Sequence, residues 1–207
     1  MLAMPSCRAI ALSIGLLFLT VFSASAAESP ALVKARALFN AANYEGAIDA
    51  ASVARKEAQW ADAAALIVAR ARLERYRQSG SAIELAEARE ALRGVKSASL
   101  NPRDQVDLLI GLGQALYFGE VFGAAADLFD TALEKGPLLG ERDRTLLLDW
   151  WATALDREAQ LRSVDRRAPV YERIGARMDR ELHGDPSSSV KMRSIRSTWP
   201  SVCRKCS

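Results

Sequence analysis

The sequence predicts an all-α protein, and two observations lead to that prediction. Ala, Leu, Glu and Arg dominate the 207 residues, whereas Val, Ile and Thr are scarce and never alternate with polar residues over the length of a strand. The first group loses little conformational freedom in a helix, and the second is the group enriched in strands. Signals that start and stop helices also recur along the chain. We therefore expect helices joined by short loops.

The first 26 residues have the pattern of a cleaved signal peptide. Met1–Arg8 carries one basic side chain, Ala9–Phe22 is a run of 14 residues without charge, and small residues follow up to Ala27. Ala24 and Ala26 fit an A-x-A-like cleavage site, and cleavage one residue later is nearly as good. The alternative is an uncleaved membrane anchor, but the run is short for a spanning helix, which needs about 20 residues. We therefore expect export to the bacterial periplasm or outside the cell.

The rest of the chain divides into a helical domain, residues 27–185, and a tail, residues 186–207. The ~180 residues after the signal peptide suffice for one domain with an ordinary core. Without Arg8, 27 basic residues face 25 acidic ones, and the two signs are mixed along the chain. No basic face interleaved with aromatic residues is present, so nucleic acid is not a predicted partner. The mature chain has no second long apolar segment and is not expected to span a membrane.

The first four predicted helices span residues 30–42, 44–58, 60–77 and 81–94. Asn43 lies between the first two as a cap, because its side-chain oxygen can accept from the free amides of the next helix. Ser81 and Glu84 have the spacing of a capping box that opens the fourth helix, and Gly94 ends it.

The next four predicted helices span residues 102–118, 121–135, 141–160 and 168–182. Asn101 caps the fifth helix, Pro102 occupies its first turn without loss of a hydrogen bond, and Asp104 faces the positive end of the helix dipole. The sixth helix is expected to stop at Gly136-Pro137, a left-handed cap followed by a residue that cannot continue a helix. Because the loops are short, successive helices should form antiparallel hairpins, either bundled or stacked.

Internal repetition favours stacking. From Leu109 the chain reads L-x2-L-G-x2-L-x5-F-x2-A-x3-F-x2-A, with Pro137 as a terminator beyond it. This segment resembles the tetratricopeptide repeat (TPR) at all of its signature positions. Gly113 and Ala125 are small, so the two helices of the pair can approach closely. The matching residues are Leu109, Leu112, Gly113, Leu116, Phe122, Ala125, Phe129 and Ala132.

The other three pairs fit the same frame less well. In the first pair most positions match or are smaller than the consensus, but Lys34 falls where an apolar residue is expected. The second helices of the four pairs begin near residues 44, 81, 121 and 168. These starts are 37 to 47 residues apart, whereas the standard repeat has a period of ~34 residues. The resemblance covers about residues 30–182. It implies a divergent array of antiparallel hairpins that stack as a right-handed α-solenoid.

The resemblance also implies a function, because the first helices of such pairs line a concave groove that holds a peptide or a partner helix. Amides suit a peptide backbone, and rings anchor its side chains. We therefore expect an exported protein-interaction scaffold. The groove positions carried over are Asp107, Ile110, Gln114, Tyr117 and Phe118 in the third pair, Leu32, Arg36, Phe39 and Asn40 in the first, and Leu66, Arg70, Leu73 and Glu74 in the second.

No catalytic, metal or cofactor site is predicted, and the chain is not expected to be an enzyme. The common nucleotide, zinc-protease and serine-hydrolase motifs are absent. His183 is the single histidine and lies at a predicted helix end, where the dipole accounts for it. Cys203 and Cys206 have metal-like spacing but lack the second pair that zinc needs, so a disulfide or pairing with another chain is expected in an exported protein.

Two patterns in the helical domain are open to more than one interpretation. Adjacent helical residues point about 100° apart, so one of Trp150 and Trp151 can be in the core while the other lies at a seam or faces the groove. The run formed by Arg70, Arg72, Arg75 and Arg77 indicates either a solvated face or a basic wall for an acidic peptide.

The tail is the third open feature. Residues 187–207 contain seven serines, five basic residues and no acid, which fits either a natural disordered end or a truncated, frame-shifted one. Two alternative functions follow. One is a helical portion of a larger envelope protein. The other is an α-solenoid enzyme of the cell envelope with acidic residues in its groove.

Overall fold

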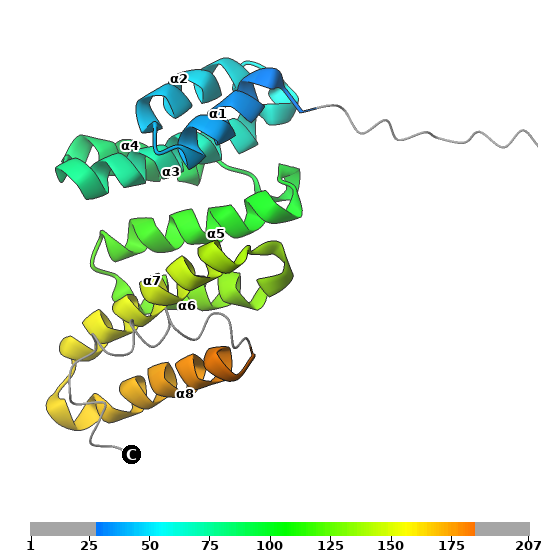
Figure 1. Ribbon diagram of the computed structural model, residues 1–207. Coiled ribbons are helices and arrows are strands. Elements are labelled where there is room, and N and C mark those ends of the chain that lie inside the picture. Colours follow the sequence, from blue (N-terminus) through cyan, green and yellow to red (C-terminus); the bar gives the residue numbers. More distant parts are fainter. Residues whose placement is uncertain (1–27, 185–207) are drawn as a thin grey trace, which may run out of the picture.

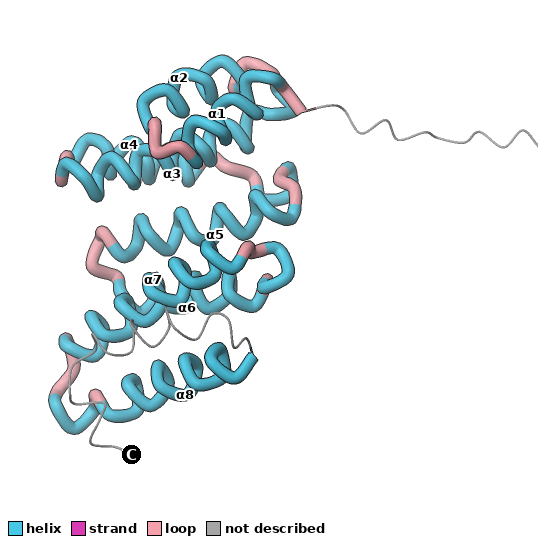
Figure 2. The backbone as a smooth tube through the Cα atoms, in the orientation of Figure 1, coloured by secondary structure: helices cyan, strands magenta, loops and turns pink. Residues whose placement is uncertain are grey.

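The computed structural model describes residues 28–184, and this part of the protein is all-α (Figure 1). Short loops and 3-10 turns join its helices, and no strand occurs within the described range (Figure 2). The predicted signal peptide and the tail with Cys203 and Cys206 lie outside that range. The helices are α1 (Pro30–Asn40), α2 (Tyr44–Ala54), α3 (Ala61–Ser79), α4 (Ala82–Arg93), α5 (Pro102–Tyr117), α6 (Phe122–Glu134), α7 (Glu141–Gln160) and α8 (Ala168–Gly184).

Every predicted helix is present, and two of the predicted caps are confirmed. The Asn43 side chain accepts a hydrogen bond from the Gly46 amide at 3.0 Å, which opens α2. Asn101 accepts from the Asp104 amide at 2.8 Å, with Pro102 in the first turn of α5. Both side chains satisfy an amide that has no partner inside its own helix.

Two other predicted caps are wrong. Ser81 makes no side-chain capping bond, and Glu84 does not reach back to it, because Arg72 and Arg75 of α3 bind its carboxylate. The Gly136-Pro137 pair does not form a left-handed cap, since the chain continues there into a 3-10 turn. The glycine with a left-handed backbone is instead Gly80, which ends α3 at φ 68°. Glycine adopts this conformation without the steric cost of a side chain.

The helices stack in chain order. Each helix contacts the next, and α1, α3 and α5 also contact one another in succession. Figure 1 shows the result as an elongated stack, with the α1–α2 pair at one end and α8 at the other. Alternate helices therefore form a continuous layer, which places residues from distant parts of the sequence on one face.

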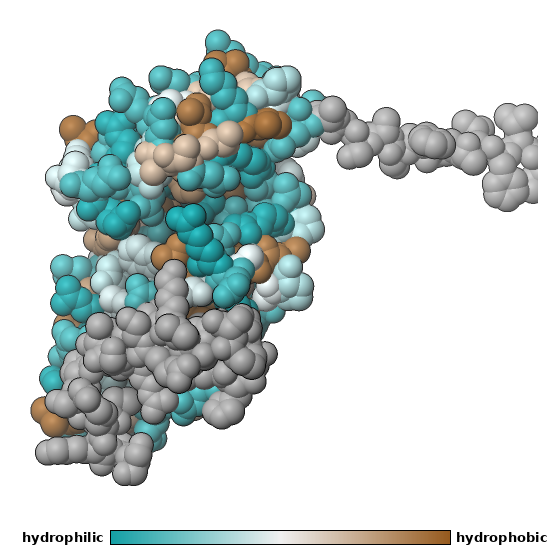
Figure 3. All heavy atoms as spheres, viewed as in Figure 1, coloured by the Kyte–Doolittle hydropathy of each residue, from teal (hydrophilic) through white to brown (hydrophobic). Residues whose placement is uncertain are grey.

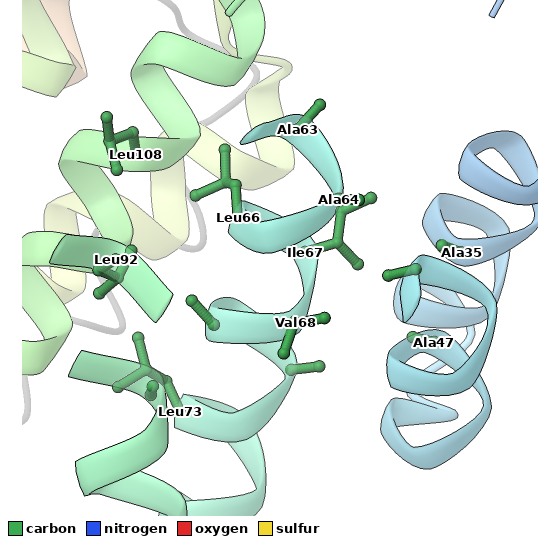
Figure 4. Packing of buried hydrophobic residues seen from close by; sticks show 14 of the residues in the cluster. Ala35, Ala47, Ala63, Ala64, Leu66, Ile67, Val68, Leu73, Leu92 and Leu108 are labelled. Carbon is green, nitrogen blue, oxygen red and sulfur yellow. The ribbon is translucent and has the colours of Figure 1, made fainter. Parts of the chain in front are cut away.

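The core consists of two hydrophobic clusters that meet at α5. The first is built from α1–α4, and α5 adds Leu108 and Ala115 to it. Figure 4 shows α3 in the middle of this cluster, between Ala35 and Ala47 on one side and the leucines of α4 and α5 on the other. The second cluster is built from α6–α8, and α5 adds Val106 and Ile110 to it. Opposite faces of α5 thus join the two halves of the molecule.

Gly113 lies where α5 packs closely against α6. A Cβ added there would lie 2.4 Å from Cε1 of Phe129, whose side chain is fully buried in α6. Carbon atoms do not approach so closely, so any larger residue would displace the Phe129 ring. The prediction that Gly113 is small for close packing is confirmed.

Candidate functional site

A cavity of about 540 Å³ opens on the layer formed by alternate helices. We call it the groove. The first helix of every pair contributes to its wall, so residues more than 100 positions apart in the sequence face the same space. The lining consists of Phe39, Asn40, Ala42 and Tyr44 from α1 and the start of α2, Arg70 and Glu74 from α3, Arg103, Ile110 and Gln114 from α5, and Arg142, Asp143, Leu146, Leu147 and Trp150 from α7.

Six of the positions carried over from the repeat frame lie in this lining. Phe39 and Asn40 come from α1, and Asn40 is exposed at the end of its helix. The others are Arg70, Glu74, Ile110 and Gln114. The structure brings them together from three helices.

Leu32, Leu66 and Leu73 do not reach the groove. Leu32 and Leu73 have no exposed surface, and Leu66 is 2% exposed, because all three pack in the first hydrophobic cluster. A side chain without exposed surface offers a partner nothing to contact. Their assignment as groove positions is therefore corrected to core positions.

Arg36 is a structural residue rather than a free groove side chain. Its Nη1 and Nη2 atoms donate to the two carboxylate oxygens of Asp104, both at 2.7 Å, and its Nε donates to Glu28 at 2.9 Å. The hydrogen bond to Asp104 raises the pKa of Arg36, against the opposing effect of burial. Asp104 is 2% exposed. This bidentate pair ties α1 to α5 across 68 positions of sequence.

Asp107, another predicted groove position, lies beneath the lining. It is 5% exposed and forms ion pairs with Arg70 at 3.0 Å and with Arg103 at 3.4 Å. Arg103 also pairs with Asp143 at 2.6 Å. These ion pairs form a continuous network that runs from Arg70 through Asp107 and Arg103 to Asp143. The network connects α3, α5 and α7 under the groove.

The pKa of Arg103 reflects this network. Burial acts to lower the pKa, but the hydrogen bond to Asp143 and the charge of Asp107 outweigh it, so the value lies above the ordinary one. The guanidinium of Arg70 lies 4.7 Å from the centre of the Phe39 ring, which adds a cation–π contact between α3 and α1. The charged floor thus holds the lining residues in place.

Tyr117 and Phe118 pack against other rings and do not line the cavity. Tyr117 lies 5.2 Å from Trp150 between ring centres, and Phe118 lies 5.7 Å from Trp150 and 4.8 Å from Tyr76. Each pair is edge-to-face, the favoured arrangement of aromatic rings. Both residues therefore support Trp150, which does line the groove. Its neighbour Trp151 is 1% exposed in the second cluster, so the tryptophan pair is divided between groove and core.

The arginine run of α3 does not form a free basic wall. Arg72 and Arg75 bind Glu84 of α4, with Arg72 at 3.0 Å and Arg75 at 2.9 Å. Arg77 binds Glu74 at 2.8 Å. Arg70 forms an ion pair with Asp107, so each of the four arginines has a carboxylate partner.

The contribution of α7 was missed by the sequence analysis. Arg142, Asp143 and Leu146 line the groove, although no groove position was carried over to the fourth pair. A usable signal was present in the sequence, because Leu146, Leu147 and Trp150 match apolar positions of the repeat and so fix the helical frame of α7. The helical period then predicts which residues of α7 are exposed on the groove side.

Figure 3 shows mainly hydrophilic side chains, in teal, on the face of the described residues in view, with separate brown apolar residues among them. Within residues 28–184 no group of His, Cys, Asp and Glu is arranged to hold a metal ion. No helix in that range is both long and apolar enough for a membrane crossing. The side chain of His183 lies outside the described set.

Comparison of the sequence with models of known protein families found no match, and comparison with curated proteins found no significant relative.

Proposed function

We propose that the protein is an exported TPR-like scaffold that binds a peptide or partner helix in the groove and does not catalyse a reaction. The single observation behind this proposal is that one cavity is lined by the first helix of all four pairs. The repeat resemblance implies a binding surface in that place. The order of helix contacts and the close approach at Gly113 support the TPR-like arrangement.

The chemistry of the lining suits a protein partner. Phe39, Leu146 and Trp150 offer apolar and aromatic surface, while Asn40 offers an amide. Buried aromatic and aliphatic anchors dominate the energy of most protein interfaces. The ion pairs under the groove fix its shape before binding, which lowers the entropy cost of association.

Export rests on the pattern of the first 26 residues. Expression of the full chain in a Gram-negative bacterium should release a shortened protein into the periplasm, with its new terminus near Glu28. A chain that starts at Glu28 should stay in the cytoplasm. Cell fractionation with N-terminal sequencing measures both, and retention of the full-length chain in the cytoplasm would contradict export.

Binding is tested by capture with groove variants that do not disturb the core. Leu146 is 49% exposed, so Leu146→Ser removes groove surface at little cost in stability. Val53→Ser is the matched control, since Val53 is 55% exposed on α2 and lies outside the groove. Partners captured by the parent should be lost with Leu146→Ser and kept with Val53→Ser. Equal capture by both variants would rule out the groove as the binding site.

A further inference from the structure

The charges of the groove are balanced internally, with one exception. Arg70, Arg103 and Asp143 belong to the network under the groove, and Glu74 pairs with Arg77. Arg142 is the one charged lining residue in the described chain for which no ion pair or hydrogen bond is formed. A cation without a partner at the wall of a cavity is available to an anionic group of a ligand.

Arg142 begins a stripe on the exposed face of α7. Leu146 follows one turn later and Asp149 two turns later, and all three side chains are exposed. Residues seven apart lie on nearly the same side of a helix, separated by about 10 Å along its axis. The stripe therefore presents a cation, an apolar group and an anion in order. We call it the α7 stripe.

Asp149 is unfavourably placed in the free protein. Burial by its surroundings raises its pKa, and no cation within the described residues compensates it. Asp149 itself is outside the groove lining, at its edge, next to Trp150, which lies in the lining. A cationic group from a partner would relieve this cost.

Most polar side chains of the groove already pair with other side chains, so few remain for a peptide backbone. The Gln114 amide is 6% exposed and already faces Glu74 at 3.5 Å, which leaves Asn40 as the accessible side-chain amide of the lining. An extended peptide needs partners for its backbone amides and carbonyls, whereas a helix satisfies its own. The lining therefore favours a helical ligand.

We propose that the groove binds an amphipathic partner helix that lies along α7, with an acidic side chain against Arg142, an apolar one against Leu146 and a basic one against Asp149. This inference rests on the proposed function and specifies the helical form and the charge pattern of the ligand. On the partner, the acidic and basic residues lie two turns apart with the apolar residue between them, so that all three share one face.

The test uses three synthetic helical peptides of about 18 residues, a length at which Ala-rich sequences hold a helix. One carries Glu, Leu and Lys at successive turns, the second has Glu and Lys exchanged, and the third has Gln in place of both. Fluorescence anisotropy at low salt measures the dissociation constant of each. The parent protein should prefer one charged order over the other by about tenfold, with the Gln peptide between them.

Charge exchange in the protein should reverse that preference. R142E combined with D149R should bind the charged peptide that the parent disfavours about tenfold better than the one the parent prefers. The matched control is E90R with R93E, because this ion pair of α4 is 72% exposed at both side chains and lies away from the groove. The control should keep the preference of the parent.

Three outcomes overturn the inference. Equal binding of all three peptides would show that the groove binds helices without discriminating between their charge patterns. The proposed function would then stand. Failure of all three peptides to bind, while Leu146→Ser still abolishes capture of a cellular partner, would show that the partner is not a helix of this pattern. Failure of peptides and capture together would remove the proposed function as well.

Discussion

The two halves of the molecule are stabilised by different kinds of core. In the cluster of α1–α4, alanine supplies 11 of the 20 buried residues and no aromatic side chain is among them. In the cluster of α5–α8, alanine supplies 6 of 18, and Phe129 and Trp151 are buried. Small side chains let helices approach closely, but each buries little apolar area. The two halves reach the same helical stacking by close backbone contact in one and by large rings in the other.

The joint between the halves is ionic as well as apolar. On α5, Asp104 forms an ion pair with Arg36 of α1, and Asp107 forms one with Arg70 of α3. A buried ion pair adds little net stability over an apolar contact, but loss of one partner leaves an uncompensated charge. The joint is therefore a place where a single change should have a large effect on how the first helices line the groove.

The largest expected effect contrasts the two cores directly. Phe129→Ala should lower the free energy of unfolding by about 4 kcal/mol, because a fully buried ring is removed and a cavity remains. Ala51→Gly, at an equally buried site of the first cluster, should lower it by about 1 kcal/mol. Urea unfolding followed by circular dichroism measures both. Similar losses at the two sites would contradict the contrast between the cores.

The next effect concerns the joint. Asp104→Asn should cost about 3 kcal/mol, since it leaves Arg36 partly buried opposite a neutral group. Glu28→Gln removes the other, more exposed partner of Arg36 and should cost less than about 0.5 kcal/mol. Thermal unfolding of the two variants provides the comparison. A negligible change with Asp104→Asn would mean that the joint does not depend on this pair.

Glycine packing provides a smaller contrast along α5. Gly113→Ala should cost about 2 kcal/mol, because the Phe129 ring must move, although alanine favours the helix by about 1 kcal/mol. At Gly111 the nearest atom is Leu92 Cδ2 at 3.3 Å, the end of a flexible side chain. Gly111→Ala should therefore change stability by less than about 1 kcal/mol. If the order of the two costs is reversed, the packing account of Gly113 fails.

The C-terminal half should depend on pH through Glu181. Burial raises the pKa of this carboxyl, but the hydrogen bonds and charges of Arg144 and Arg177 outweigh burial and hold the pKa below its ordinary value. A lowered pKa in the folded state means that the stabilisation is complete above about pH 4.3, the unfolded value. It is lost as the pH falls through the folded value.

Glu181→Gln tests this pH dependence. The variant should lower the free energy of unfolding by about 1 kcal/mol at neutral pH, and the difference from the parent should shrink below pH ~4. Unfolding of both proteins across the acid range measures the difference. A gap that stays constant over that range would exclude titration of Glu181 as the cause.

The smallest expected effect has the opposite sign. The raised pKa of Asp149 means that folding favours its protonated form, so its contribution is present at acid pH and lost as the pH rises through the folded pKa. Asp149→Asn should therefore stabilise the protein at neutral pH, by no more than about 0.5 kcal/mol at this exposed position. Destabilisation by Asp149→Asn would show that the carboxylate has a partner in the free protein.

The local signals in the sequence predicted the helices well, because caps and helix formers act within a few residues. Asn43 and Asn101 are examples, since each bonds an amide three positions away. The Ser81 cap failed for the opposite reason. Glu84 is bound by arginines of another helix, and no local rule contains that contact.

The groove was predictable in part, in each pair for which positions were carried over. In the well-matched third pair, Ile110 and Gln114 line the groove as expected. In the same pair Tyr117 and Phe118 do not line it. In the first pair Phe39 and Asn40 line the groove, whereas Leu32 is fully buried in the first cluster. The buried position of Asp107 followed from its arginine partners on two helices, which a single repeat cannot reveal.

The most direct test of the central claim is site-specific photo-crosslinking in cells. A photoreactive amino acid replaces Asn40 or Leu146 in the groove, and Asp49, an exposed residue of α2 outside it, as the control. Mass spectrometry identifies what each site captures. We predict one shared partner crosslinked from both groove positions and not from Asp49. No partner at either groove position, or the same partners at all three sites, would contradict the account.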